Sequence, residues 1–143
     1  MPSQVTVLLA ANDTELLNDL AFTLNHNGYH VVSANSGDGA IALADVRLPQ
    51  LAVVDMLLPG QSGFQLARLL KERSDWRIPV VMISDQTAAA HRDYAFAAGA
   101  DQFLEKWLAP TRLLEIVQAL CPRPELPRRP GSGTLPRPTT TPA

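Results

Sequence analysis

The chain has 143 residues, with 12 lysines and arginines against 14 aspartates and glutamates, which is the length of about one domain. A single cysteine, Cys121, excludes an internal disulfide framework and a cysteine-rich zinc site. The mild acidity disfavours direct binding to nucleic acid, and no apolar run is long enough to span a membrane. The start of the chain shows no secretory signal, so the sequence predicts a soluble, cytoplasmic protein.

The average charge hides two different segments, divided near position 121. Residues 122–143 hold seven of the 12 prolines, four arginines and one glutamate, so this stretch carries a charge of +3. The first 121 residues, with eight basic and 13 acidic side chains, carry −5. Prolines at such density exclude helices and central strands. We therefore predict a folded domain over residues 4–121 and a disordered or partly polyproline II tail over 122–143.

Short apolar runs alternate with helical patterns along the predicted domain. The predicted strands lie at residues 5–11, 29–34, 51–55, 79–84 and 102–106. Apolar residues at helical spacing follow each strand, and Thr111 is expected to cap the last of these helices. The first, third and fourth strands are nearly continuous apolar runs, as in strands buried on both faces. This order predicts an α/β fold, a doubly wound (βα)5 parallel sheet of the flavodoxin-like kind.

Polar side chains stand at the predicted carboxyl ends of the strands, where doubly wound sheets place their working sites. In chain order they are Asn12, Asp13, Asp55, Ser84, Asp85 and Lys106. Two neighbouring carboxylates repel each other unless a cation lies between them, and oxygen ligands with water suit Mg²⁺. An aspartate beside a divalent cation, a hydroxyl and a lysine suits phosphoryl transfer, with an aspartate as the nucleophile. Lys106 would then neutralise charge on the transferring group.

These residues closely resemble the receiver domain of bacterial two-component response regulators, of the chemotaxis-regulator kind. The resemblance covers residues 4–121 and is carried by segments 11–13, 53–63, 79–84 and 99–106. Within it, Pro59 and Gly63 follow Asp55 by four and eight positions. The resemblance implies that Asp55 accepts a phosphoryl group from a histidine kinase or a phosphotransfer protein. It also implies a set of contacts: Ser84 and Lys106 to the phosphoryl group, and Asp13, Asp55, the backbone carbonyl of Leu57 and, through water, Asn12 to Mg²⁺.

The resemblance further implies a switch and a partner face. Ser84 and Phe103 occupy the switch positions, and Phe103 stands where the family often has a tyrosine. The aromatic residues implied for a partner or homodimer face are Tyr94, Phe96, Phe103 and Trp107. The protein is then expected to be a phosphoacceptor switch and not a metabolic enzyme. It would signal to a downstream protein or through a homodimer.

Three further positions depart from the family pattern and keep other hypotheses open. Asn12 stands in place of an acid, Asp85 in place of a small residue, and Trp107 in place of a proline. They favour a second hypothesis, a pseudo-receiver that binds partners without phosphorylation. A third hypothesis is a flavin-binding electron carrier on the same fold. It requires a phosphate-cradling loop after the first strand, where residues 10–13 place a carboxylate instead.

Overall fold

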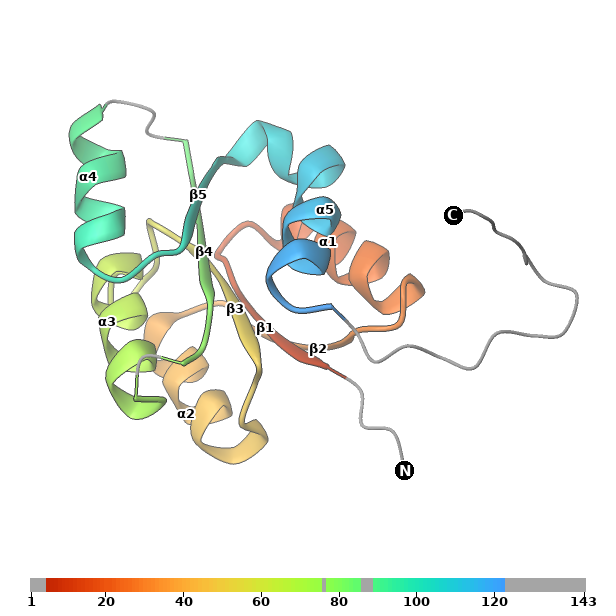
Figure 1. Ribbon diagram of the computed structural model, residues 1–143, viewed down its shortest axis with the longest axis horizontal. Helices are drawn as coiled ribbons and strands as arrows, with labels where there is room; N and C mark the ends of the chain where they lie inside the picture. The colour runs from red at the N-terminus through yellow and green to blue at the C-terminus, as the bar shows by residue number, and fades with distance from the viewer. Residues whose placement is uncertain (1–4, 76, 86–88, 123–143) are drawn as a thin grey trace, which may run out of the picture.

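The computed structural model describes residues 5–75, 77–85 and 89–122, in which strands and helices alternate (Figure 1). The strands are β1 (Thr6–Ala10), β2 (His30–Ala34), β3 (Leu51–Asp55), β4 (Val80–Ser84) and β5 (Gln102–Glu105). The α-helices are α1 (Thr14–His26), α2 (Gly37–Arg47), α3 (Gly63–Arg73), α4 (Ala89–Ala97) and α5 (Ala109–Leu120). A 3-10 turn, η1 (Lys106–Leu108), connects β5 to α5.

The strands form one parallel sheet in the order β2-β1-β3-β4-β5. Helices α1 and α5 cover one face of the sheet, and α2, α3 and α4 cover the other (Figure 1). The direction of winding reverses beside β1, so the ends of β1 and β3 lie at the topological switch point of the sheet. The predicted doubly wound (βα)5 fold is confirmed.

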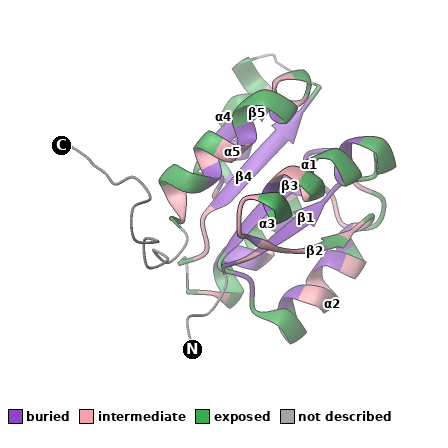
Figure 2. Cartoon of the chain, turned by 90° about the vertical axis from the view of Figure 1, so that its right-hand side faces the viewer, coloured by how far each residue is buried: buried purple, intermediate pink, exposed green. Residues whose placement is uncertain are grey.

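The central strands carry the core. Every residue of β3 and β4 is buried, as the purple strands in Figure 2 show. Along β1, Val7 and Leu9 pack under α1 and α5, whereas Leu8 and Ala10 pack under the helices of the opposite face. Successive strand residues point to opposite faces, so a strand covered on both sides needs apolar residues at every position. Burial on both faces of the sheet therefore explains the nearly continuous apolar runs in the sequence.

Side-chain caps fix where three helices begin. The side chains of Asp13, Ser36 and Ser62 each accept a hydrogen bond from a backbone N–H in the first turn of the helix that follows. Such caps satisfy amide groups that have no partner within the helix. Because Asp13 caps α1 only three residues after β1 ends, its carboxylate is held at the carboxyl edge of the sheet.

The start of α5 differs from the prediction. Thr111 is not the cap, because the helix already begins at Ala109 with Pro110 in its first turn. Proline suits this position since the first N–H groups of a helix need no partner within it. The Thr111 hydroxyl instead donates to the carbonyl of Leu108 at 3.2 Å. In the described part of the chain, no helix combines the length and the apolar character needed to cross a membrane.

Candidate functional site at the carboxyl edge of the sheet

Asp55 and Lys106 form the centre of the site. Asp55 ends β3 and is 2 % exposed, and Lys106 opens the turn that follows β5. The Asp55 Oδ1 atom accepts the backbone N–H of Leu57 at 3.1 Å, and Oδ2 lies 3.0 Å from the Lys106 Nζ atom. The two residues are 51 positions apart in sequence, and the parallel sheet brings them to the same edge. Both oxygens of this buried carboxylate are therefore engaged.

Three carboxylates act on the Lys106 ammonium group. Desolvation lowers the pKa of Lys106, but the hydrogen bond and charge of Asp55, with the charges of Asp85 and Asp13, outweigh it and raise this pKa above its usual value. Asp85 Oδ2 lies 3.9 Å from Nζ, and the Asp85 side chain is largely exposed. Lys106 is therefore protonated at neutral pH and balances a locally acidic pocket.

Asn12 and Leu57 line a common hollow of about 270 Å³ beside the end of β3. Asp13 precedes α1, and its Oδ1 accepts the N–H of Leu16 at 3.1 Å. Among the described residues, no three His, Cys, Asp or Glu side chains are placed together to hold a metal ion. The charges of Asp13 and Asp55 both act on Lys106, and these carboxylates, with the Asn12 amide and the Leu57 carbonyl that line the hollow, offer oxygen donors only. So few oxygen donors suit Mg²⁺, which keeps several of its waters, better than a metal that needs a full protein cage.

Ser84 is buried at the end of β4, on the strand next to Asp55. Its Oγ atom lies 3.5 Å from the Met56 Sδ atom. Gly63, the first residue of α3, lies against the backbone of Asp55 and Met56, since a Cβ atom there would come within 2.4 Å of the Asp55 carbonyl oxygen. Glycine at this position lets α3 start directly behind the aspartate, which explains why a glycine stands eight positions after Asp55 in this chain.

The four aromatic residues predicted for a partner face divide into two groups. Tyr94, Phe96 and Trp107 are exposed, whereas Phe103 is buried at 8 % exposure and packs in the core under α4. The guanidinium carbon of Arg92 lies 5.2 Å from the centroid of the Phe103 ring. Sequence reasoning did not find this cation–π contact, because nothing in the spacing of Arg92 and Phe103 indicates it. Because Arg92 belongs to α4 and Phe103 to β5, the contact links this helix to the strand.

The fold and the site together define a class: a doubly wound α/β domain with an aspartate, a lysine and a hydroxyl at the carboxyl edge of its sheet. Comparison with known families agrees with this class, since the model of the response regulator receiver domain matches residues 7–118. The chain belongs to the response regulator receiver domain family of two-component systems.

Individual relatives that resemble this chain are response regulators as well. Two sequences of the heme response regulator HssR from Staphylococcus aureus strains are 29 % and 30 % identical over 119 residues, or 83 % of this chain and 52 % of each relative. The chain thus spans about half the length of these relatives. A putative response regulator from Chloroflexus aurantiacus has a TM-score of 0.76 and 28 % identity, covering 82 % of this chain and 98 % of that one. The chemotaxis protein CheY4 of Vibrio cholerae, at 24 % identity over 82 % of this chain and 99 % of that one, shows the same fold with a TM-score of 0.77.

Proposed function

We propose that this receiver domain accepts a phosphoryl group on Asp55 from the phosphohistidine of a histidine kinase or a phosphotransfer protein. The observation that carries the proposal is the Asp55–Lys106 pair, with 3.0 Å between Oδ2 and Nζ at a strand end of a receiver fold. A carboxylate is a weak nucleophile toward a charged phosphoryl group, and a fixed cation beside it offsets the charge that must be brought together.

The chain's own residues divide the work of this transfer. One Asp55 oxygen forms a bond to phosphorus as the phosphorus–nitrogen bond of the donor imidazole breaks, and the imidazole keeps that electron pair. The Leu57 N–H orients the carboxylate through Oδ1. Lys106 moves its charge from Asp55 toward the phosphoryl oxygens, and the Ser84 hydroxyl at the end of β4 donates to one of them.

Mg²⁺ is the proposed cofactor, held by Asp13, Asp55 and the Leu57 carbonyl, with Asn12 acting through water. When bound, Mg²⁺ supplies positive charge against the phosphoryl oxygens. Asn12 provides no carboxylate, so this pocket has one negative charge fewer after β1 than the usual family pattern. We expect this difference to weaken Mg²⁺ binding without abolishing it.

Signalling to a partner is proposed through the exposed aromatics Tyr94, Phe96 and Trp107, with Ser84 and Phe103 as the switch. Phosphorylation would then act as a switch and not as metabolic catalysis. The partner is a downstream protein or a second copy, without direct contact to nucleic acid. We assign this function to a domain over residues 4–121, followed by the tail over 122–143.

A pseudo-receiver that binds partners without phosphorylation is the second candidate. It is favoured by Asp85, whose carboxylate lies 3.9 Å from Lys106 Nζ and competes with a phosphoryl group for that charge. Asn12 points the same way, since it weakens the proposed metal site.

The two candidates are separated by incubating the chain with Mg²⁺ and acetyl phosphate and measuring its intact mass. Phosphoacceptor function predicts the addition of one phosphoryl group, lost in Asp55→Ala and retained in a control variant such as Asp19→Ala on the exposed side of α1. If saturating donor leaves the wild-type mass unchanged, the pseudo-receiver replaces the first proposal.

A further inference from the structure

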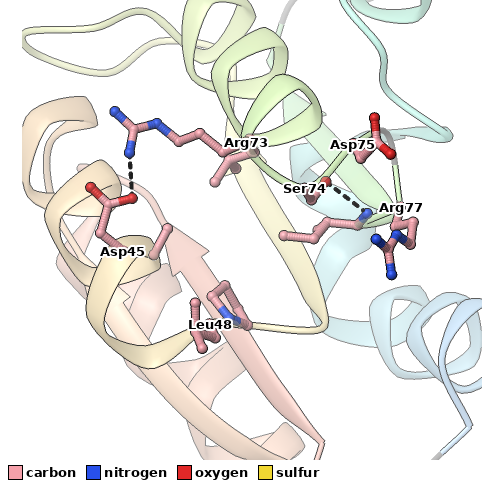
Figure 3. Close-up of a pocket in the computed structure, with 10 residues that line it drawn as sticks. Asp45, Leu48, Arg73, Ser74, Asp75 and Arg77 are labelled. Carbon is pink, nitrogen blue, oxygen red and sulfur yellow. Dashed lines mark hydrogen bonds and ion pairs between the residues drawn. The ribbon is translucent and has the colours of Figure 1, made fainter.

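A groove lies at the end of the sheet opposite to Asp55. It has a volume of about 420 Å³ and runs between the C-terminal ends of α2 and α3 (Figure 3). Its apolar lining consists of Ala44, Leu48, Pro49, Leu70 and Ile78. At one rim an ion pair between Asp45 and Arg73 connects the two helices (Figure 3). The rim carries charges of both signs, so the groove selects an occupant mainly by its apolar surface.

Leu48 stands out among the residues of this groove. It follows the last turn of α2 with φ 51° and ψ 64°, a left-handed conformation in which glycine is the usual residue. Its side chain is nevertheless 74 % exposed. A leucine here carries backbone strain and leaves apolar surface in water, although glycine would avoid both. This combination indicates that the Leu48 side chain contacts another group.

The described chain ends at the same end of the sheet as this groove, on the face that α1 and α5 cover. The Tyr29 hydroxyl donates to the carbonyl of Cys121 at 3.1 Å and so anchors the end of α5. The Cys121 Sγ atom lies 3.9 Å from the carbonyl oxygen of Gln50, the residue that follows Pro49 of the groove. The point where residues 123–143 begin is therefore next to the loop that forms one wall of the groove.

The composition of the tail matches the groove. Residues 124–127 read Pro-Glu-Leu-Pro, so Leu126 is an apolar side chain within a proline-rich stretch five positions after Cys121. In a polyproline II conformation, at about 3.1 Å per residue, Leu126 reaches about 15 Å from Cys121. The tail carries +3 against −5 for the preceding 121 residues, which favours its return to the domain surface.

We propose that residues 124–127 dock on their own domain, with Leu126 seated against Leu48 and Pro49 in the groove between α2 and α3. The groove thus serves as an intramolecular site for a proline-rich segment. It lies away from the Asp55 pocket, and the proposal does not depend on phosphorylation.

Trypsin offers a direct test in the full-length chain, because it cleaves poorly before proline. In the tail, Arg123, Arg129 and Arg137 each precede a proline, so the Arg128–Arg129 bond is the one readily cleaved. The initial rate at this bond is followed by the release of residues 129–143 in mass spectra. We expect docking to slow this cleavage relative to a free peptide of residues 122–143, since proteolysis follows the population of the open form.

Two variants and one control locate the contact. Leu48→Ser in the groove and Leu126→Ser in the tail should each raise the cleavage rate by about fivefold or more, because each removes apolar surface from the docked state. Val46→Ser is the matched control: Val46, two positions before Leu48 in α2, is 75 % exposed but does not line the groove, so the cleavage rate of this variant should stay at the wild-type value. The Leu126→Ser variant leaves the domain untouched, so unfolding cannot explain a rise there.

Equal rates for wild type, Leu48→Ser and Leu126→Ser would overturn the proposal, as would a wild-type rate equal to that of the free peptide. Protection that grows with protein concentration would also overturn it, because the tail would then dock on a second copy. The assay needs neither Mg²⁺ nor a phosphodonor, so its failure is distinct from a failure of the proposed phosphoacceptor function.

Discussion

The Lys71 ammonium group lies 2.7 Å from the Oδ2 atom of Asp101, although the Lys71 side chain is 5 % exposed. The same oxygen accepts the backbone N–H of Val80 at 2.8 Å. Asp101 therefore ties α3 to the start of β4 and to the start of β5. One of the two lysines of the chain has this structural role, and the other, Lys106, lies in the candidate site.

Loss of Asp101 should therefore be costly. We expect Asp101→Ala to lower the free energy of unfolding by about 2–4 kcal/mol, because it leaves the Lys71 charge buried and the Val80 N–H without its acceptor. Urea denaturation measures this change. Lys71→Met combined with Asp101→Ala should recover part of the loss. The control, Arg112→Ala, removes an exposed ion pair with Glu115 and should cost less than about 1 kcal/mol. An Asp101→Ala effect no larger than this control would contradict the structural role.

Asp85 should restrain phosphorylation through its charge. We expect Asp85→Asn to raise the initial rate of phosphorylation by acetyl phosphate about three- to tenfold. This is the range for removing one solvent-screened charge that lies about 6 Å from the reacting phosphoryl group. Intact-mass time courses measure the rate. The gain should shrink in about 1 M salt, where the Debye length is about 3 Å. Asp19→Asn, the same change on an exposed residue of α1, is the control. A gain of equal size in both variants would exclude a local effect of Asp85.

Asn12 should limit the affinity for Mg²⁺. Asn12→Asp adds a carboxylate to the hollow that Asn12 shares with Leu57, and we expect Mg²⁺ to bind about tenfold more tightly. Calorimetric titration with MgCl₂ gives the dissociation constants. Asn18→Asp introduces the same charge at an exposed position of α1 and should change the affinity less than twofold, about the scale of a screened surface charge. Equal affinities for wild type and Asn12→Asp would place the metal elsewhere.

Cys121 should react slowly with alkylating reagents at neutral pH. Burial raises the pKa of the Cys121 thiol, and the thiolate is the reactive form. The pH profile of iodoacetamide alkylation should therefore lie at higher pH for the native chain than for the chain in urea. The thiol then contributes stability below the pKa of the unfolded state, and this contribution is lost as pH rises through the native pKa. Cys121→Ser should remove the thiol's contribution to the pH dependence of stability. Coincident alkylation profiles for the native and the denatured chain would contradict a raised thiol pKa.

The fold could be predicted from the sequence because burial imposes a local pattern. A strand covered on both faces must be apolar at every position, and β3 and β4 show this directly. Asp55 was also predictable as a candidate, because it ends such a strand and because parallel strands bring their carboxyl ends to one edge. The predicted start of α5 was wrong. Thr111 is a suitable capping residue, but Pro110 is equally suited to the first helical turn, and the helix begins at Ala109 with Pro110 in that turn.

Contacts between distant side chains could not be predicted in the same way. Lys71 and Asp101 are 30 positions apart, and neither residue type nor spacing marks them as partners. The position of Arg92 over Phe103 depends on how α4 packs on β5, which the periodicity of either element does not fix. The groove at Leu48 likewise depends on a left-handed residue at a helix end, where sequence alone favours glycine.

The two oxygens of Asp55 are held by different parts of the chain. The backbone N–H of Leu57, two residues later, binds Oδ1, so this oxygen stays with its own turn, whereas Oδ2 is bound by a lysine that follows β5, the last strand of the sheet. Any group that binds Oδ2, whether a proton, a cation or phosphorus, has to share or displace Lys106. Binding at Asp55, on the central strand, therefore changes the contacts of the Lys106 side chain next to the last strand. The turn that presents Asp55 keeps its own hydrogen bond to Oδ1.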